Sequence, residues 1–237
     1  MDALTLTPGQ YERLLEGAGV TLSILGFAFA LGIVLSLLVG VARLSKRTWL
    51  RATSLVFVEF ARGISSIILL FIMAYAIPIL LGVDQRNLVV LASIALGINM
   101  GGYGAEIIRG AILSVPKGQT EASIALNLSD TQRLRFVVLP QALRVILPPM
   151  GNLTIEILKG TALVALIGLN DLLNVANRMR PRTDTVVLFF NVLLMYFVLA
   201  QVVNGLYRLA ERRVERRFET RSPKPDNAGL DPLGVAE

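Results

Sequence analysis

The stretch that decides the fold class is Ala18–Ala42, which reads AGVTLSILGFAFALGIVLSLLVGVA and has no charged residue in 25 positions. A second uncharged stretch of 23 residues, Thr185–Tyr207, reads TVVLFFNVLLMYFVLAQVVNGLY. The hydrocarbon core of a bilayer is about 30 Å thick and requires roughly 20 apolar residues of helix. Both stretches therefore predict membrane-spanning helices, and we expect an all-α membrane protein.

The residues before the first stretch indicate whether it is a cleaved signal or a retained helix. They contain Asp2, Glu12 and Glu16 against a single basic residue, Arg13. A signal peptide begins with a basic region and carries an apolar region of only about 7–15 residues. We therefore expect a retained helix, preceded by an extracytoplasmic N-terminal segment at residues 1–17.

Three further apolar stretches, at residues 63–83, 88–105 and 148–169, bring the expected number of transmembrane helices to about five. With the N-terminus outside, the three cytoplasmic segments carry four, five and seven Lys or Arg residues, against five outside. This bias follows the positive-inside rule and predicts a cytoplasmic C-terminus. The transmembrane domain would cover residues 18–210. The cytoplasmic tail, 211–237, would begin as a helical extension and end disordered.

The chain contains no Cys and no His. This absence excludes disulfides, thiolate chemistry, imidazole bases and the usual zinc sites. The formal net charge of +6 is explained by the predicted topology, so no nucleic-acid partner is required. The expected surroundings of most of the chain are membrane lipid.

A charged, proline-containing segment interrupts the apolar pattern at residues 121–149, EASIALNLSDTQRLRFVVLPQALRVILPP. Residues 120–126 predict a short helix, which Asn127 can end because Asn tolerates left-handed backbone. Ser129 and Gln132 have the spacing of a capping box and predict a second helix, which we expect to break near Pro140. The segment is either an ordinary solvated loop or a stiff projection that meets another protein.

The same segment resembles the EAA loop of ABC importer permeases, in which Glu-Ala-Ala is followed by a Gly and a later Leu-Pro. The resemblance to the polar amino acid uptake family covers roughly residues 15 to 220 and rests on Glu121-Ala122-Ser123, Asn127, Leu139-Pro140, Glu106–Gly110, Val115–Gln119 and Leu158–Leu163. The motifs Ala125-Leu126-Asn127 and Lys159–Leu163 look most like the ectoine and hydroxyectoine branch. The sequence departs from the family at Ser123 and Asn127, which replace an Ala and a Gly.

The resemblance implies a type I ABC importer permease fold and a cytoplasmic coupling loop at about residues 106–145. It assigns contacts with the ATPase to Gly118, Glu121, Ala122, Ser123 and Asn127. The chain has no G-x-x-x-x-G-K-[ST] phosphate loop, so ATP and Mg²⁺ would bind a separate ATPase dimer and this subunit would catalyse no reaction. The other implied partners are an extracytoplasmic solute-binding protein and a second permease subunit, a homologue in preference to a second copy.

Several polar residues fall within the predicted spans and are candidates for the solute path. Acid–base pairs at i, i+3 occur at Glu59–Arg62, Glu106–Arg109 and Glu156–Lys159, and each pair could neutralise itself on one helix face. Glu106–Arg109 abuts the cytoplasmic loop and favours a structural role. Intramembrane polar residues usually face a bundle interior or a wet cavity. The path candidates are Arg62, Asn99, Asn152, Glu156, Lys159 and Thr161.

The sequence therefore predicts the membrane-spanning subunit of an ATP-driven importer in the bacterial inner membrane, for polar amino acids or a related zwitterion such as ectoine or hydroxyectoine. Two other classes stay open. An ion-driven secondary transporter would show uptake that collapses with the ion gradient and not with ATP. A non-transporting membrane anchor would leave solute uptake unchanged when it is deleted.

Overall fold

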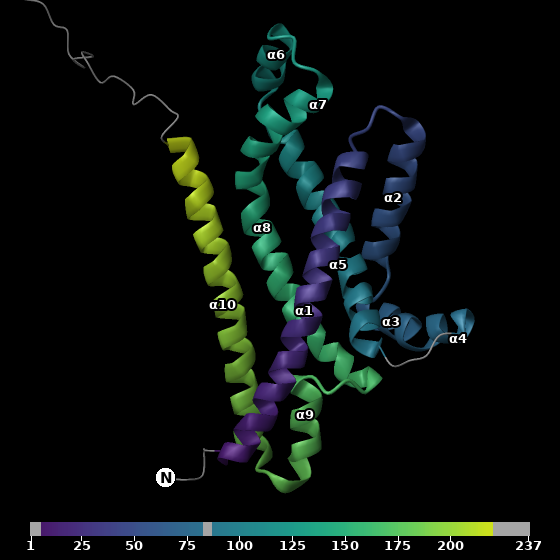
Figure 1. Ribbon diagram of the computed structural model, residues 1–237, viewed down its shortest axis with the longest axis vertical. Helices are drawn as coiled ribbons and strands as arrows, with labels where there is room; N and C mark the ends of the chain where they lie inside the picture. The colour runs from purple at the N-terminus through teal and green to yellow at the C-terminus, as the bar shows by residue number, and fades with distance from the viewer. Residues whose placement is uncertain (1–5, 83–86, 220–237) are drawn as a thin grey trace, which may run out of the picture.

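The computed structural model describes residues 6–82 and 87–219, and these residues form an elongated bundle of helices (Figure 1). The first helix, α1 (Pro8–Ala42), begins with a proline at its first position, where the missing N–H has no partner to lose. The amide of Thr7 donates to Oε1 of Gln10 at 2.8 Å, which gives this helix end a capping box. The predicted span 18–42 is thus part of a 35-residue helix that begins ten residues earlier.

Helix α5 (Leu88–Leu113) packs along α1 in the same direction and forms the centre of the bundle. The two backbones approach closely because small residues face each other. A Cβ added at Gly40 would lie 2.9 Å from the carbonyl oxygen of Ala105, and one added at Gly104 would collide with Ser36. The buried core continues outward from this seam through residues such as Ile24, Leu96 and Met100.

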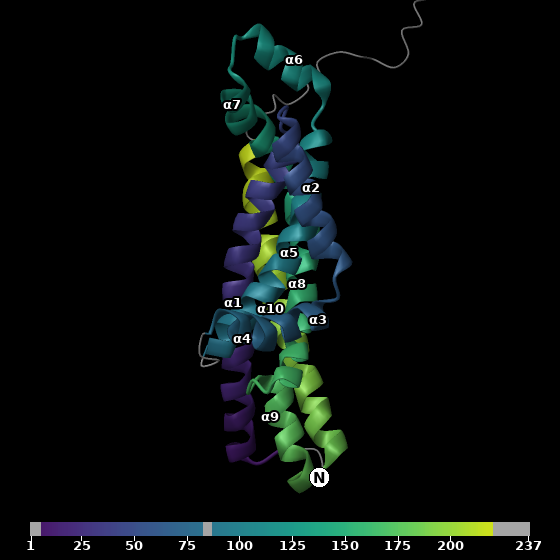
Figure 2. The same ribbon diagram turned by 90° about the vertical axis from the view of Figure 1, so that its right-hand side faces the viewer.

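Helix α2 (Thr48–Gly63) packs against α5, and Asn99 Nδ2 donates to the carbonyl oxygen of Ala61 at 3.1 Å. The chain then turns by 100° into three short helical pieces, α3 (Ser66–Phe71), η2 (Ile72–Ala76) and α4 (Ile77–Leu81). These pieces run across the bundle, as both views show (Figures 1 and 2). The span predicted at residues 63–83 is therefore wrong as a single helix: its pieces run across the bundle, and they pass as a candidate span only when paired with α2.

At one end of the bundle, α6 (Lys117–Ala125) and α7 (Asp130–Arg133) form a helical hairpin, residues 117–133, that projects beyond the other helices (Figure 1). A π-helical turn, η4 (Leu134–Val138), leads directly into α8 (Leu139–Gly160). The break expected near Pro140 is wrong. The π turn precedes Pro140, which stands in the first turn of α8, where its missing N–H is tolerated.

The remaining elements are η5 (Thr161–Ile167), α9 (Leu172–Met179), η6 (Arg180–Arg182) and α10 (Thr185–Glu219). Asp171 caps α9 by accepting hydrogen bonds from the amides of Leu173 and Asn174, both at 3.1 Å. Helix α10 continues past Tyr207 to Glu219, which confirms a helical extension into the tail. The disorder predicted for the end of the tail falls on residues 220–237, outside the described residues.

Four helical segments are long and apolar enough to cross a membrane, and the bent pair would make a fifth. The described residues form helices connected by turns, so the predicted all-α fold with about five spans is confirmed. The hairpin and the C-terminal ends of α1, α5 and α10 lie at one end of the bundle, and the start of α1 lies with α9 at the other (Figures 1 and 2).

Candidate functional site

The turn between α6 and α7 shows why the hairpin is stiff. Asn127 has φ +56°, the left-handed conformation that its sequence position predicted. Its amide donates to the carbonyl oxygen of Ile124 at 2.8 Å, and the amide of Leu128 donates to that of Ser123 at 3.1 Å. This pair of bonds is the Schellman arrangement, which satisfies the last carbonyls of α6 and fixes the direction of the following chain.

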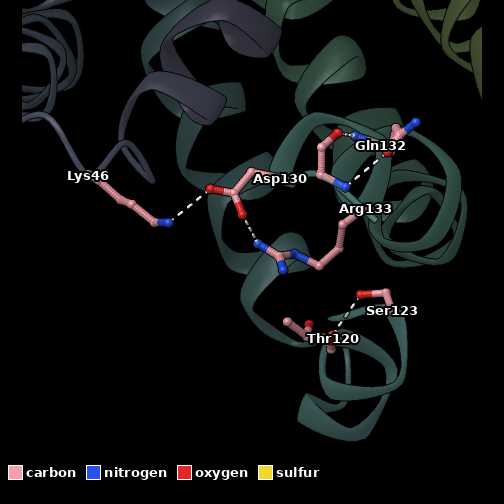
Figure 3. Close-up of polar contacts among 7 residues, drawn as sticks. Lys46, Thr120, Ser123, Asp130, Gln132 and Arg133 are labelled. Carbon is pink, nitrogen blue, oxygen red and sulfur yellow. Dashed lines mark hydrogen bonds and ion pairs between the residues drawn. The ribbon is translucent and has the colours of Figure 1, made fainter. Parts of the chain in front are cut away.

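The predicted capping box at the start of α7 is also confirmed. The amide of Gln132 donates to Ser129 Oγ at 3.3 Å, and the amide of Ser129 donates to Gln132 Oε1 at 2.9 Å. Asp130 pairs with Arg133 one turn later and with Lys46 Nζ at 2.9 Å (Figure 3). The Lys46 contact ties the hairpin to the loop that follows α1, a link that no local spacing in the sequence indicated.

The five predicted coupling residues do not all reach the surface of the hairpin. Ser123 is only 2% exposed, and its hydroxyl donates to the carbonyl oxygen of Thr120 at 2.6 Å (Figure 3). Ser123 therefore packs within the hairpin, which a small residue allows. The others, Gly118, Glu121, Ala122 and Asn127, are exposed.

The hairpin also exposes large apolar side chains that sequence reasoning missed. Leu126 is 75% exposed and Ile124 is more than half exposed, as is Phe136 in the π turn η4 that follows the hairpin. The hairpin projects beyond the apolar part of the bundle, so these side chains would not be covered by the bundle's own helices. An exposed apolar cluster beside a carboxylate, Glu121, is typical of a surface that another protein covers.

Glu106 forms the pair with Arg109 that its spacing predicted, at 2.8 Å. Arg43, at the end of α1, approaches the other carboxylate oxygen at 3.1 Å. The result is one carboxylate held between two guanidinium groups of different helices at the hairpin end of the bundle. This geometry supports the structural role expected for Glu106, and it adds a partner from α1 that the i, i+3 rule could not find.

Three of the solute-path candidates lie on one face of α8. Asn152, Glu156 and Lys159 follow each other at i, i+4 and i+7, which places them along one side of a helix, and all three are exposed. The opposite side of α8, including Leu153 and Ile157, is buried in the bundle. A membrane-crossing helix thus presents an amide, a carboxylate and an ammonium group away from its own chain.

The other path candidates have different surroundings. Asn99 is 8% exposed and bonded to α2, and Thr161 is buried with its hydroxyl donating to the carbonyl oxygen of Leu158 at 2.6 Å. Arg62 is exposed, with its guanidinium 5.4 Å from the ring centre of Tyr103. Asn99 and Thr161 are therefore bonded within this chain, and Arg62 lies on a surface.

Two of the three predicted acid–base pairs are not ion pairs. Within residues 6–82 and 87–219, no ion pair joins Glu59 to Arg62 or Glu156 to Lys159. Over the same ranges, no three Asp or Glu residues lie close enough to hold a metal ion. The charges of Glu156 and Lys159 are thus available to a ligand or to another chain.

Comparison with known proteins agrees with this arrangement. Residues 32–216 match the family described as the binding-protein-dependent transport system inner membrane component. The chain belongs to this family. It is a multi-pass inner-membrane permease subunit, it is not an enzyme, and the ATPase of such a transporter is a separate subunit.

Individual relatives cover nearly the whole chain. A probable amino-acid ABC transporter permease protein, y4tF, of Sinorhizobium fredii is 41% identical over 206 residues, which are 85% of this chain and 87% of the relative. The glutamine transport system permease protein GlnP of Escherichia coli is 35% identical over 203 residues, 85% of this chain and 93% of GlnP.

Solved structures share the fold. The crystal structure of an amino acid ABC transporter with histidines matches with a TM-score of 0.76 and 28% identity, over 86% of this chain and 94% of that one. An inward-facing structure of the MetNI methionine ABC transporter matches with a TM-score of 0.73 over 88% and 99% of the two chains. At 22% identity, the second match is a likeness of fold alone.

Proposed function

We propose that this permease forms part of an ATP-driven importer for polar amino acids or a related zwitterion. The observation that carries the proposal is the exposed face of α8, where Asn152, Glu156 and Lys159 present a neutral, an anionic and a cationic group along a membrane-crossing helix. A zwitterion carries one positive and one negative group, so a site that binds it needs a negatively charged acceptor and a positively charged donor. The names of the relatives, which include amino-acid and glutamine permeases, support the same substrate class.

The proposed topology places the N-terminus outside and the hairpin in the cytoplasm. The positive-inside bias supports it, since Arg43, Lys46 and Lys117 lie at the hairpin end of the bundle. In this orientation Glu121 and the apolar residues Ile124 and Leu126 would contact an ATPase dimer, which would hold the ATP and Mg²⁺. Gly118, Ala122 and Asn127 would contribute backbone and small side chains to the same contact, with Ser123 supporting it from within.

The exposed polar face of α8 also supports a second permease subunit. A charged face toward lipid would be costly, at least about 2.5–3.5 kcal/mol for each unpaired charge. We propose that a homologous permease covers this face and that the solute passes between the two subunits. An extracytoplasmic solute-binding protein would deliver the solute to the end that carries α9.

A finer proposal concerns the substrate. The motifs Ala125-Leu126-Asn127 and Lys159–Leu163 favour ectoine or hydroxyectoine within the zwitterion class. Both compounds carry a carboxylate and a delocalised cation, and therefore make the same demand on Glu156 and Lys159. The curated relatives named above carry amino-acid and glutamine descriptions, which favour a proteinogenic amino acid.

The test is uptake of labelled solute in cells with and without this gene. We expect labelled polar amino acids to accumulate only in cells with the gene, with accumulation abolished by ATP depletion. The finer proposal is tested with labelled ectoine: it stands if ectoine uptake needs the gene and only unlabelled ectoine and hydroxyectoine compete with it. Uptake that is the same in both strains for every zwitterion would contradict the proposed function.

A further inference from the structure

A groove of about 830 Å³ lies between the first turns of α1 and the α9–η6 segment. These elements stand at the end of the bundle opposite the hairpin (Figure 1). The two walls of the groove are fixed to each other. Gln10 Nε2 donates to Thr183 Oγ1 at 2.8 Å, and the amide of Leu172 donates to Thr21 Oγ1 at 3.2 Å. A Cβ added at Gly17 would lie 3.0 Å from Cα of Leu172, so α9 lies directly on α1. The groove is therefore preformed.

Three arginines from three elements line this groove: Arg13 from α1, Arg178 from α9 and Arg182 from η6. Glu16 is the one acidic residue among those lining it. Within residues 6–82 and 87–219, none of the three arginines forms an ion pair with a carboxylate. The lining of the groove consequently carries a net positive charge, with three arginines against one glutamate.

This charge is unexpected at this end of the molecule. In the proposed topology the groove lies outside, where the positive-inside rule disfavours Lys and Arg. A cation near the last turn of α9 could be explained by the helix dipole, and Arg178 has that position. The dipole does not explain Arg13, which reaches the same groove from α1. A shared anionic ligand would explain all three.

The level of the groove relative to the bilayer indicates which kind of anion it would bind. The apolar stretches of α1 and α10 begin at Ala18 and Thr185. Arg13 precedes the first by five residues, about 7.5 Å of helix, and Arg182 precedes the second by three. The headgroup layer of a bilayer extends roughly 5–8 Å beyond the hydrocarbon. The arginines therefore lie at headgroup level.

Apolar side chains complete the lining of the groove. Val20, Val175 and Met179 contribute to it, and Val20 lies within the apolar stretch of α1. A ligand that contacts both the arginines and these side chains needs an anionic head and an apolar part. A soluble anion or an acidic protein surface offers the anionic group without the apolar part.

We propose that this groove binds an anionic phospholipid, with the phosphate held by Arg13, Arg178 and Arg182 and the first acyl methylenes against the apolar lining. Guanidinium groups bind phosphate oxygens through paired hydrogen bonds, which suits this arrangement. The position at headgroup level follows from where the apolar stretches of α1 and α10 begin. Only the assignment to the outer leaflet rests on the proposed function and its topology.

The test measures lipid retained by the purified, intact transporter. The complex in mild detergent is titrated with phosphatidylglycerol or phosphatidylcholine, and bound lipid is counted by native mass spectrometry. We expect phosphatidylglycerol to be retained in preference, and Arg178→Gln or Arg182→Gln to weaken its retention about fivefold each. Arg180→Gln is the matched control, because Arg180 lies between the two on the same exposed segment but does not line the groove.

Four outcomes would overturn the proposal. Equal retention of the two lipids would remove the anionic preference, and equal losses in all three variants would show a general charge effect. Displacement of the lipid by millimolar inorganic phosphate would assign the arginines to a free anion. Weaker capture of the solute-binding protein with unchanged lipid retention would assign the groove to that protein. Because the readout counts lipid, it does not depend on which solute is carried.

Discussion

Lys46 Nζ lies 2.9 Å from Asp130 Oδ2, and this ion pair joins the loop after α1 to the first residue of α7. Both side chains are more than half exposed, so solvent screens the pair and it should contribute little to the free energy of unfolding. Its importance is geometric, because it connects the projecting hairpin to the end of a transmembrane helix.

We expect Lys46→Met to accelerate amide hydrogen exchange in the hairpin while leaving global stability nearly unchanged. The ion pair restrains the N-terminal end of α7, and high salt should reduce the difference between variant and wild type by screening the pair. Lys117→Met is the control, because it removes a hairpin lysine that forms no ion pair within the described residues. Identical exchange in the two variants would contradict the restraint.

Asn127 tests the conformation of the hairpin turn. Asn127→Gly should be tolerated, because glycine adopts a φ of +56° without strain. Asn127→Val should destabilise the turn by about 1–2 kcal/mol, because a β-branched residue clashes in left-handed backbone. Thermal unfolding of the purified transporter measures the difference. A valine variant as stable as the glycine variant would show that the turn has another conformation.

Glu121 tests the docking of the ATPase. Glu121→Arg reverses the exposed charge beside Ile124 and Leu126, and we expect at least about tenfold lower recovery of the ATPase with the tagged permease. The permease itself should remain in the membrane. Glu12→Arg makes the same reversal at the opposite end of the bundle and should leave recovery unchanged. Full recovery with Glu121→Arg would count against a role of this residue in coupling.

Glu156 tests the solute path. Glu156→Gln keeps the size of the side chain and removes its charge, and we expect uptake to fall about tenfold with assembly intact. Thr161→Val is the control, since Thr161 is buried and its hydroxyl donates to the carbonyl oxygen of Leu158 in the same chain. It should leave the apparent affinity for solute unchanged. Normal uptake kinetics in Glu156→Gln would remove this residue from the path.

The stability of the folded protein should depend on pH through Asp171. Burial raises the pKa of this carboxyl above its ordinary value, and the hydrogen bonds from the amides of Asn174 and Leu173 oppose that rise only in part. An acid with a raised pKa in the folded state binds its proton more tightly there. Stability should therefore rise as the pH falls from neutrality toward the ordinary pKa of about 3.9.

Two variants separate the charge of Asp171 from its capping bonds. Asp171→Asn keeps an acceptor for the α9 amides and should be at least as stable as wild type at pH 7, with little change on acidification. Asp171→Ala loses the cap and should cost about 1 kcal/mol at either pH. Melting temperatures at pH 7 and pH 5 provide the measurement. An asparagine variant with the pH response of the wild type would place the titrating group elsewhere.

The features that could be predicted from sequence are those with local causes. The length of two stretches without charged residues predicted the spans of α1 and α10. The positive φ of Asn127 and the capping box of Ser129 and Gln132 depend on residues within a few positions of each other. The pair of Glu106 with Arg109 follows from helix geometry in the same way.

The features that could not be predicted depend on distant neighbours. The 100° turn after Gly63 is one such feature. A helix that runs across the bundle has the same apolar composition as one that runs along it, so composition does not reveal the turn. The partners Arg43 for Glu106 and Ala61 for Asn99 come from other helices. At Pro140 the expected break was replaced by a π turn, which a proline rule applied to one residue does not anticipate.

The close contact between α1 and α5 limits how this permease can change shape. With Gly40 against the carbonyl of Ala105, and Gly104 against Ser36, a one-turn slide of about 5.4 Å would bring larger side chains into these positions. The two helices should therefore move as one rigid body. Lys46, attached to the end of α1, would then transmit a displacement of the hairpin to both helices at once. Relative motion within this subunit is then expected outside the α1–α5 pair, for example at the 100° bend after α2.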